Sequence, residues 1–220
     1  MTGLGTLALV LAVLMPFLGV LAGLVFGGRY VRAVALITIL AVLAVVVSIA
    51  FSFVQSAQPL TYLLGAWAPP LGIALRADGL SVAMMLVVAV VVAGIAAYAW
   101  GDFATPADSA EKRAPFMYWL LLMAVWGSLN LVFLSGDLFT LYVALELLTF
   151  AGVPLVCLDG RGETLRAALR YLLFALAGSL LYLLGAVLLY GAYGTLDIAL
   201  LADLVRPGPI AWTAAALMTV

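Results

Sequence analysis

GDLFTLYVALELLTFAGVPLVCLDGRGETLRAALR, residues 136–170, is the stretch that decides the fold of this 220-residue chain. Its first part is apolar for long enough to span a bilayer, yet it carries a carboxylate, Glu146, with eight uncharged residues before it and twelve after it. An acidic side chain at the centre of a membrane helix costs roughly 2.5–3.5 kcal/mol, so chains keep one where it meets a partner or a wet path. Arg170 follows in the next apolar segment. An acid and a base on consecutive membrane helices therefore form the candidate site.

The composition indicates an integral membrane protein. A soluble domain carries about 25% charged residues, whereas this chain is 9% charged and 68% apolar. Its mean hydropathy is +1.31. We therefore expect a multi-pass protein of the cell (cytoplasmic) membrane, in contact with the lipid bilayer. The net charge of −1 gives no basis for nucleic-acid binding.

The residue types that usually carry chemistry are scarce. Cys157 is the one cysteine and histidine is absent, so an intrachain disulfide is excluded and the commonest metal ligand is missing. The sequence also contains no glycine-rich phosphate loop and no nucleophile motif. We therefore expect this chain to hold no cofactor and no metal, and to have no catalytic residue of its own.

Apolar runs of about 20 residues, the length of a membrane-spanning helix, recur along the chain. They predict an all-α polytopic membrane protein with six transmembrane helices, at 4–26, 33–54, 79–101, 115–135, 138–158 and 165–192. A seventh helix is expected to start near Pro209 and is cut off at Val220. The first run is too long for the apolar part of a signal peptide and lacks a basic leader, so we expect it to remain as a helix. Residues 1–220 are expected to form a single membrane domain.

Two features of the first helices concern packing. Pro16 lies in the middle of the first helix, and glycines follow at 19, 23 and 27, a spacing that lets helix backbones approach closely. This pattern predicts a mild kink and tight packing. Between the second and third helices, two short, partly apolar runs flank a proline turn within residues 55–78, which predicts a β-hairpin at the membrane surface.

Polar residues at helix starts are expected to act as caps. Asp78 or Ser81 can cap the third helix, and Asp137 can cap the fifth, because a side-chain oxygen there accepts a hydrogen bond from an unpaired backbone N–H. Capping is the preferred interpretation of these residues over a role in transport.

The basic residues predict the orientation. With the loops numbered alternately, one side carries six basic residues and the other carries two, Arg76 and Arg206. The six are Arg29, Arg32, Lys112, Arg113, Arg161 and Arg166. Because cytoplasmic loops carry the excess of Lys and Arg, the N-terminus is predicted to lie outside.

The surroundings of Glu146 are suited to proton transfer. It lies about 12 Å from the outer end of its helix at 1.5 Å per residue. Tyr142 and Thr149 share its face, one turn away on either side, and their hydroxyls can donate hydrogen bonds or hold a water. Pro154 removes one backbone donor and favours local hydration. Glu146 is thus expected to exchange the proton, with Tyr142 and Thr149 as its polar neighbours.

Arg170 is predicted to lie about 9 Å from the cytoplasmic end of the sixth helix, and Glu146 about 18 Å from the same end. A direct ion pair and a bridging water both remain open. Because arginine keeps its proton at any workable pH, Arg170 is expected to be an electrostatic modulator. Two other interpretations also stay open: Glu146 can be a structural residue bonded to a neighbouring helix, and Arg170 can be a juxtamembrane cation that reaches back to the interface.

Several segments together resemble one family. They are DLFTLYVALELL at 137–148, LRAALRYLL at 165–173, LLYGAYGTLDIALLADL at 188–204 and LGAWAPPLGIALRADGLSVAMML at 64–86. They resemble the antiporter-like proton-conducting membrane subunits: the A-type and D-type subunits of Mrp antiporters, the large pump subunits of respiratory complex I, and relatives in membrane hydrogenases. The resemblance runs from residue 62 to 204, and it is nearest to the D-type Mrp protein.

The resemblance implies roles and also shows departures. Glu146 matches the family's helix-five glutamate, which takes part in proton transfer, whereas Arg170 stands where many members have a lysine. Family members carry about twice as many helices, in two inverted repeats. This chain corresponds to the N-terminal part of such a subunit and ends before the family's helix-seven lysine. The resemblance further implies other membrane subunits of a hetero-oligomeric complex as partners.

The sequence therefore predicts a proton-translocating or cation/proton antiport subunit, with protons and Na⁺ as candidate ions. Such a subunit can belong to a redox-driven pump without catalysing a reaction itself. The alternative is a non-conducting scaffold subunit that anchors a redox or other partner complex. A quinone- or haem-binding redox enzyme is poorly supported, because no axial ligand is evident. The coupled ion, the driving reaction and the particular complex stay unassigned.

Overall fold

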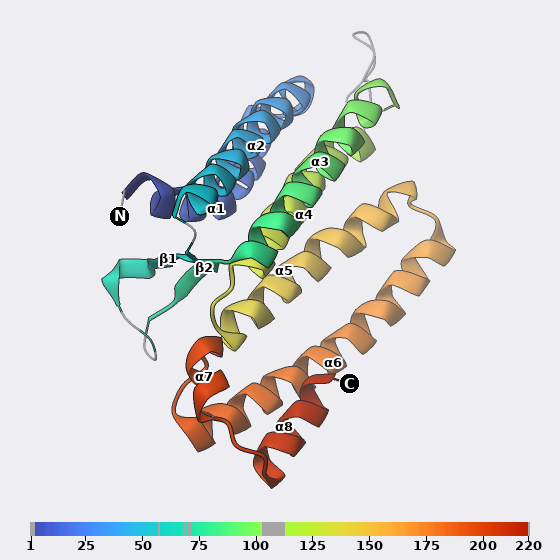
Figure 1. The fold of residues 1–220 in the computed structure, drawn as a ribbon. Helices are drawn as coiled ribbons and strands as arrows, with labels where there is room; N and C mark the ends of the chain where they lie inside the picture. The colour runs from blue at the N-terminus through green and yellow to red at the C-terminus, as the bar shows by residue number, and fades with distance from the viewer. Residues whose placement is uncertain (1–2, 57, 68, 70–71, 103–112, 220) are drawn as a thin grey trace.

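The structure, a computed structural model, describes residues 3–56, 58–67, 69, 72–102 and 113–219. Within these residues six helices are long and apolar enough to cross a membrane. They are α1 (Gly3–Phe26), α2 (Val31–Ser56), α3 (Gly79–Asp102), α4 (Arg113–Leu134), α5 (Leu138–Val156) and α6 (Gly162–Tyr193). A shorter apolar helix, α8 (Pro209–Thr219), packs along α6 (Figure 1). The predicted all-α membrane fold is confirmed.

The helix ends differ from prediction around one turn. α5 ends two residues early, at Val156, and α6 begins three residues early, at Gly162. Gly160 has a φ of 65°, a left-handed conformation that glycine adopts without steric cost, and this reverses the chain within a few residues. One further helix, α7 (Ile198–Leu204), is too short to show an apolar period and was not anticipated.

The predicted hairpin is present. β1 (Leu60–Leu63) and β2 (Ala74–Ala77) pair antiparallel, with Leu60 opposite Ala77 and Leu63 opposite Ala74. Part of the proline turn lies outside the described residues. The hairpin lies at the same end of the bundle as the start of α5 (Figure 1). We call this the hairpin end, and the end that carries residues 157–161 the far end.

The core lies among α1, α2, α3 and α4. Half of the α4 span is buried, against 17% of the α5 span and 17% of the α6 span. The largest fully buried side chains include Trp119 and Trp126 of α4 and Leu9 of α1. Figure 1 shows α5 and α6 lying to one side of the first four helices. The candidate site thus lies on the less covered side of the bundle.

The predicted close packing of α1 is confirmed. A Cβ added to Gly19 would come within 2.5 Å of the Thr38 hydroxyl, and one added to Gly23 within 2.6 Å of Leu120. Pro16 lacks an N–H, so the carbonyl of Ala12 loses its partner within the helix. The side-chain amide of the fully buried Asn130 donates to that carbonyl at 2.8 Å. Asn130 therefore connects α4 to the point in α1 that proline leaves unpaired.

The predicted cap of α3 is also present. The Ser81 N–H donates to an Asp78 carboxylate oxygen at 2.8 Å, and the Ser81 hydroxyl donates to the same oxygen at 3.0 Å. The backbone hydrogen bond is the largest of the effects that hold the pKa of Asp78 below its ordinary value of 3.8, and burial opposes it. Asp78 thus acts as an ionised cap at neutral pH.

Candidate functional site

Backbone hydrogen bonds at the hairpin end fix the start of α5. The Gly136 N–H donates to the carbonyl of Ala74 in β2 at 3.1 Å, and the Gly136 carbonyl accepts from Ile198 at 3.0 Å. A Cβ on Gly136 would lie 2.6 Å from the Ala74 oxygen, so glycine is required for this approach. The hairpin, the linker before α5 and the segment before α7 are therefore connected. Glu146, ten residues after Gly136, takes its position from this junction.

Asp137 caps α5 as predicted. Its carboxylate accepts from the Thr140 N–H at 2.7 Å and from the Thr140 hydroxyl at 2.6 Å. The helix then continues without a break through Glu146 to Val156. This cap fixes where α5 begins, and Glu146 follows nine residues later.

Glu146 lies in the middle of the α5 span and is half-buried. Tyr142 and Thr149 share its face, four residues before it and three after it. The Thr149 hydroxyl donates to the Leu145 carbonyl of its own helix at 3.0 Å, so its oxygen can only accept, from a water or from Glu146 in its protonated form. Among the described residues, no side chain or backbone group is recorded as bonded to the Glu146 carboxylate.

Tyr142 is held by a residue that sequence reasoning missed. Its ring stacks on that of Tyr182 in α6, with centroids 6.2 Å apart and planes at 13°. The Tyr182 hydroxyl donates to the Leu138 carbonyl at 3.2 Å. The rings of Phe139 and Tyr142 are also 6.2 Å apart. Because the contact joins two helices 40 residues apart, no local spacing in the sequence indicates it.

A cleft of about 770 Å³ opens among α4, α5 and α6, on the far-end side of Glu146. Leu145, Thr149 and Gly152 line it from α5, and Thr164 and Tyr171 line it from α6. Glu146 does not line the cleft itself, but Leu145 and Thr149, which flank it on α5, both do. The cleft thus places a large open volume next to the residues that flank the carboxylate.

Among the described residues, Arg170 and Glu146 form no ion pair. Because α6 starts early, Arg170 is about 12 Å and Glu146 about 15 Å from the far-end termini of their helices, so the two lie at similar depth. Arg170 is exposed, and like Glu146 it does not line the cleft itself, although Ala167 and Tyr171 on either side of it do. In the described part of the chain, the one recorded ion pair joins Arg161 and Asp159 at 3.5 Å. The modulating role of Arg170 stays a prediction.

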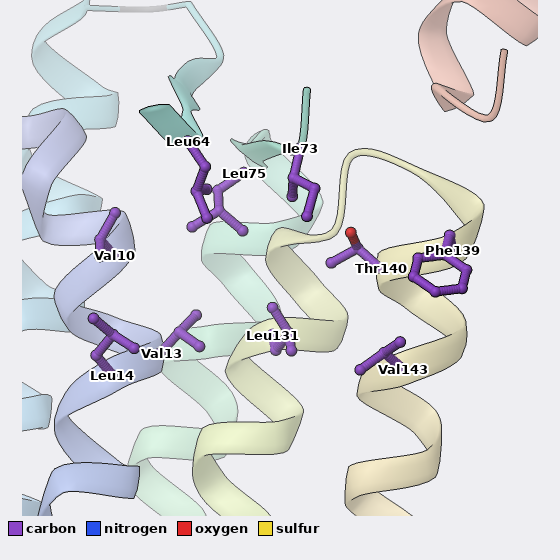
Figure 2. A pocket seen from close by; sticks show the side chains of 10 residues that line it. All are labelled: Val10, Val13, Leu14, Leu64, Ile73, Leu75, Leu131, Phe139, Thr140 and Val143. Atoms are coloured by element: carbon purple, nitrogen blue, oxygen red, sulfur yellow. The ribbon is translucent and has the colours of Figure 1, made fainter. Parts of the chain in front are cut away.

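A second cavity, of about 350 Å³, lies below the hairpin between α1 and α5, with α4 behind it (Figure 2). Its lining is aliphatic or aromatic except for Thr140, and the Thr140 hydroxyl already donates to Asp137. The cavity therefore offers no group for proton or ion transfer.

Comparison with known proteins agrees with this architecture. Residues 135–220 match the model of the family described as NADH:quinone oxidoreductase/Mrp antiporter, TM. The chain is 34% identical over 197 residues to "Putative antiporter subunit mnhD2" of Staphylococcus aureus, strain JH9. That match covers 86% of this chain and 37% of the relative, so the chain spans less than two fifths of the relative's length.

Three solved structures share the fold. A chain of the archaeal membrane-bound sulfane sulfur reductase superimposes with a TM-score of 0.82 at 25% identity, over 96% of this chain and 43% of that one. A chain of the Mrp complex from Dietzia sp. gives 0.79 at 26% identity, over 99% and 40%. A chain of respiratory complex I from Thermus thermophilus gives 0.69 at 22% identity, over 96% and 42%, which shows the fold alone.

The family match, the relative and the shared fold all converge on one group of multi-pass membrane proteins. Over the N-terminal part of its relatives, this chain belongs to the antiporter-like subunit family shared by Mrp antiporters and NADH:quinone oxidoreductase.

Proposed function

We propose that this chain acts in a proton-translocating or cation/proton antiport complex, and that Glu146 exchanges the proton. The observation that carries the proposal is a half-buried carboxylate in the middle of a membrane span. The residues that flank it on α5, Leu145 and Thr149, line a large cleft. A charged group at this depth is costly unless it serves a path or meets a partner. Its family supplies the context, since the relatives are antiporter and respiratory subunits.

The two directions along α5 differ around the carboxylate. Toward the far end, the cleft is lined by Thr149 and Gly152 of α5 and offers a volume of about 770 Å³ beside the residues that flank Glu146. Toward the hairpin end, the rings of Tyr142, Phe139 and Tyr182 pack together. The carboxylate then takes up and releases a proton through the side that holds the cleft, which the positive-inside rule assigns to the cytoplasm. Arg170 modulates the site from a distance, and neighbouring membrane subunits complete the path.

The test replaces Glu146 with glutamine in the full-length protein within its complex. Ion-driven proton movement is followed with a pH-sensitive dye in membrane vesicles, together with the amount of assembled complex. We expect Glu146→Gln to abolish transport at normal assembly and Glu146→Asp to retain part of it, because only aspartate keeps a titratable group. Glu163→Gln, at the exposed start of α6, is the matched control and should transport normally. Full transport by Glu146→Gln would refute the proposal.

The scaffold function remains the second candidate, because α5 and α6 leave most of their spans uncovered and so offer a wide surface to other membrane segments. The same experiment separates the two. A scaffold subunit tolerates Glu146→Gln but loses assembly when the apolar surface of α6 is changed. A conducting subunit loses transport when Glu146 is replaced by glutamine.

A further inference from the structure

The contact between Tyr142 and Tyr182 assigns a role to a residue outside the proposed proton path. We propose that Tyr182 is a positioning residue for the Glu146 site: its ring holds Tyr142 in the orientation in which the Tyr142 hydroxyl serves Glu146. This inference rests on the proposed function. It adds a residue on α6 to a site otherwise built from α5.

Tyr182 is itself fixed at two points. Its hydroxyl donates to the Leu138 carbonyl at 3.2 Å, in the first turn of α5. Its ring then lies nearly parallel to that of Tyr142, at 13°, with centroids 6.2 Å apart. Centroid distances and angles of this kind are those of attractive offset-stacked pairs. Tyr182 therefore connects the backbone of α5 to a side chain one turn further along the same helix.

The direction of helical side chains explains why Tyr142 matters to Glu146. The bond from Cα to Cβ tilts toward the helix N-terminus in both residues, so Glu146 leans back over the turn that carries Tyr142, while the Tyr142 ring itself leans toward Phe139 and packs on Tyr182. Residues four apart on a helix are neighbours. A contact that limits the motion of the Tyr142 ring therefore also limits where the Tyr142 hydroxyl can lie. That hydroxyl is the polar group that the Glu146 carboxylate meets on its hairpin-end side, directly or through one water.

A structural tie between α5 and α6 is the competing explanation for the same contact. It predicts that loss of Tyr182 lowers assembly and transport together, without changing the pH dependence of transport. A positioning role predicts a change in pH dependence that needs Tyr142 to be present. The two explanations therefore differ in a measurable coupling between the two tyrosines.

The experiment measures transport against pH in vesicles that contain the full-length protein within its complex. The variants are Tyr142→Phe, Tyr182→Leu, Tyr182→Phe and the double variant Tyr142→Phe/Tyr182→Leu. A hydroxyl that donates to a carboxylate favours the charged form, so we expect Tyr142→Phe to move the pH of half-maximal transport upward by about one unit. Tyr182→Leu should move it in the same direction. Tyr182→Phe keeps the stacking ring and loses only the bond to Leu138, so it should move the value less than Tyr182→Leu does.

The double variant decides the matter, because a residue that acts through Tyr142 adds nothing once the Tyr142 hydroxyl is gone. We expect the double variant to match Tyr142→Phe. Additive shifts, or unchanged pH midpoints with reduced assembly, would overturn the inference. Should Tyr182→Leu fail to assemble, Tyr182→Met keeps the volume without a stacking ring and provides the same comparison. If Glu146→Gln abolishes transport while the tyrosine variants keep the wild-type midpoint, this inference fails and the proposed function stands.

Discussion

Replacing Asn130 with leucine tests how α1 accommodates its proline. The Asn130 amide donates at 2.8 Å to the Ala12 carbonyl, and both residues are fully buried. Leucine has a similar volume but no donor, so the carbonyl that Pro16 leaves unpaired would stay unpaired. Pro16→Ala restores the backbone N–H that closes this bond within α1. The hydrogen bond from Asn130 should then matter only in the presence of Pro16.

The magnitude follows from the environment of the bond. An unpaired buried acceptor costs about 1–3 kcal/mol, while measured interhelical hydrogen bonds in membrane proteins average about 0.6 kcal/mol and reach about 1.7. We therefore expect a coupling of about 1–2 kcal/mol between Asn130→Leu and Pro16→Ala in a double-mutant cycle. The packing change caused by removing the proline ring cancels in the cycle.

The assay is reversible unfolding of the full-length protein in detergent micelles, followed by circular dichroism. Ser128→Ala provides the matched control. Ser128 is also fully buried on α4, but its hydroxyl donates to Ala124 within its own helix at 2.9 Å. Its coupling to Pro16→Ala should be near zero. Equal couplings for Asn130 and Ser128, or none for Asn130, would refute the assigned role of this bond.

Three further substitutions test other parts of the structure. Asp78→Ala should destabilise the protein by about 0.5–2 kcal/mol at neutral pH through loss of the α3 cap. Because folding lowers the pKa of Asp78, the cap contributes stability above about pH 3.8, and that stability is lost as the pH falls through the folded pKa. The free energies of unfolding of wild type and variant, measured by urea titration, should therefore converge in acid. Gly136→Ala should destabilise by about 1–3 kcal/mol through the clash with the Ala74 carbonyl, whereas Gly178→Ala, with nothing within 4 Å of the added Cβ, should not lower the melting temperature. Arg170→Gln should shift the pH profile of transport while Arg170→Lys should not; an unchanged profile for both would make Arg170 an interface cation.

The helices could be predicted from sequence because length and apolar composition alone specify a membrane span. The caps at Asp78 and Asp137 could be predicted for a similar reason, since each depends on atoms only three residues away. The hairpin was indicated by its proline turn. All of these features are encoded locally.

The features that sequence did not reveal depend on contacts between distant residues. Tyr182 meets Tyr142, and Asn130 meets Ala12 118 positions earlier, only because the bundle brings these helices together. The depth of Arg170 was underestimated, because α6 begins at Gly162, three residues earlier than the sequence predicts. Whether Arg170 pairs with Glu146 depends on the packing of two helices, which local spacing does not specify.

The central claim is that Glu146 changes its protonation state during turnover, and infrared difference spectroscopy tests it most directly. The full complex is reconstituted in bilayers, and spectra are recorded in the carboxylic acid carbonyl region before and after an imposed pH gradient. We predict a carbonyl band in the wild-type difference spectrum that is absent from Glu146→Gln and still present in Glu163→Gln. A band that survives in Glu146→Gln, or no band in the wild type during active transport, would contradict the account.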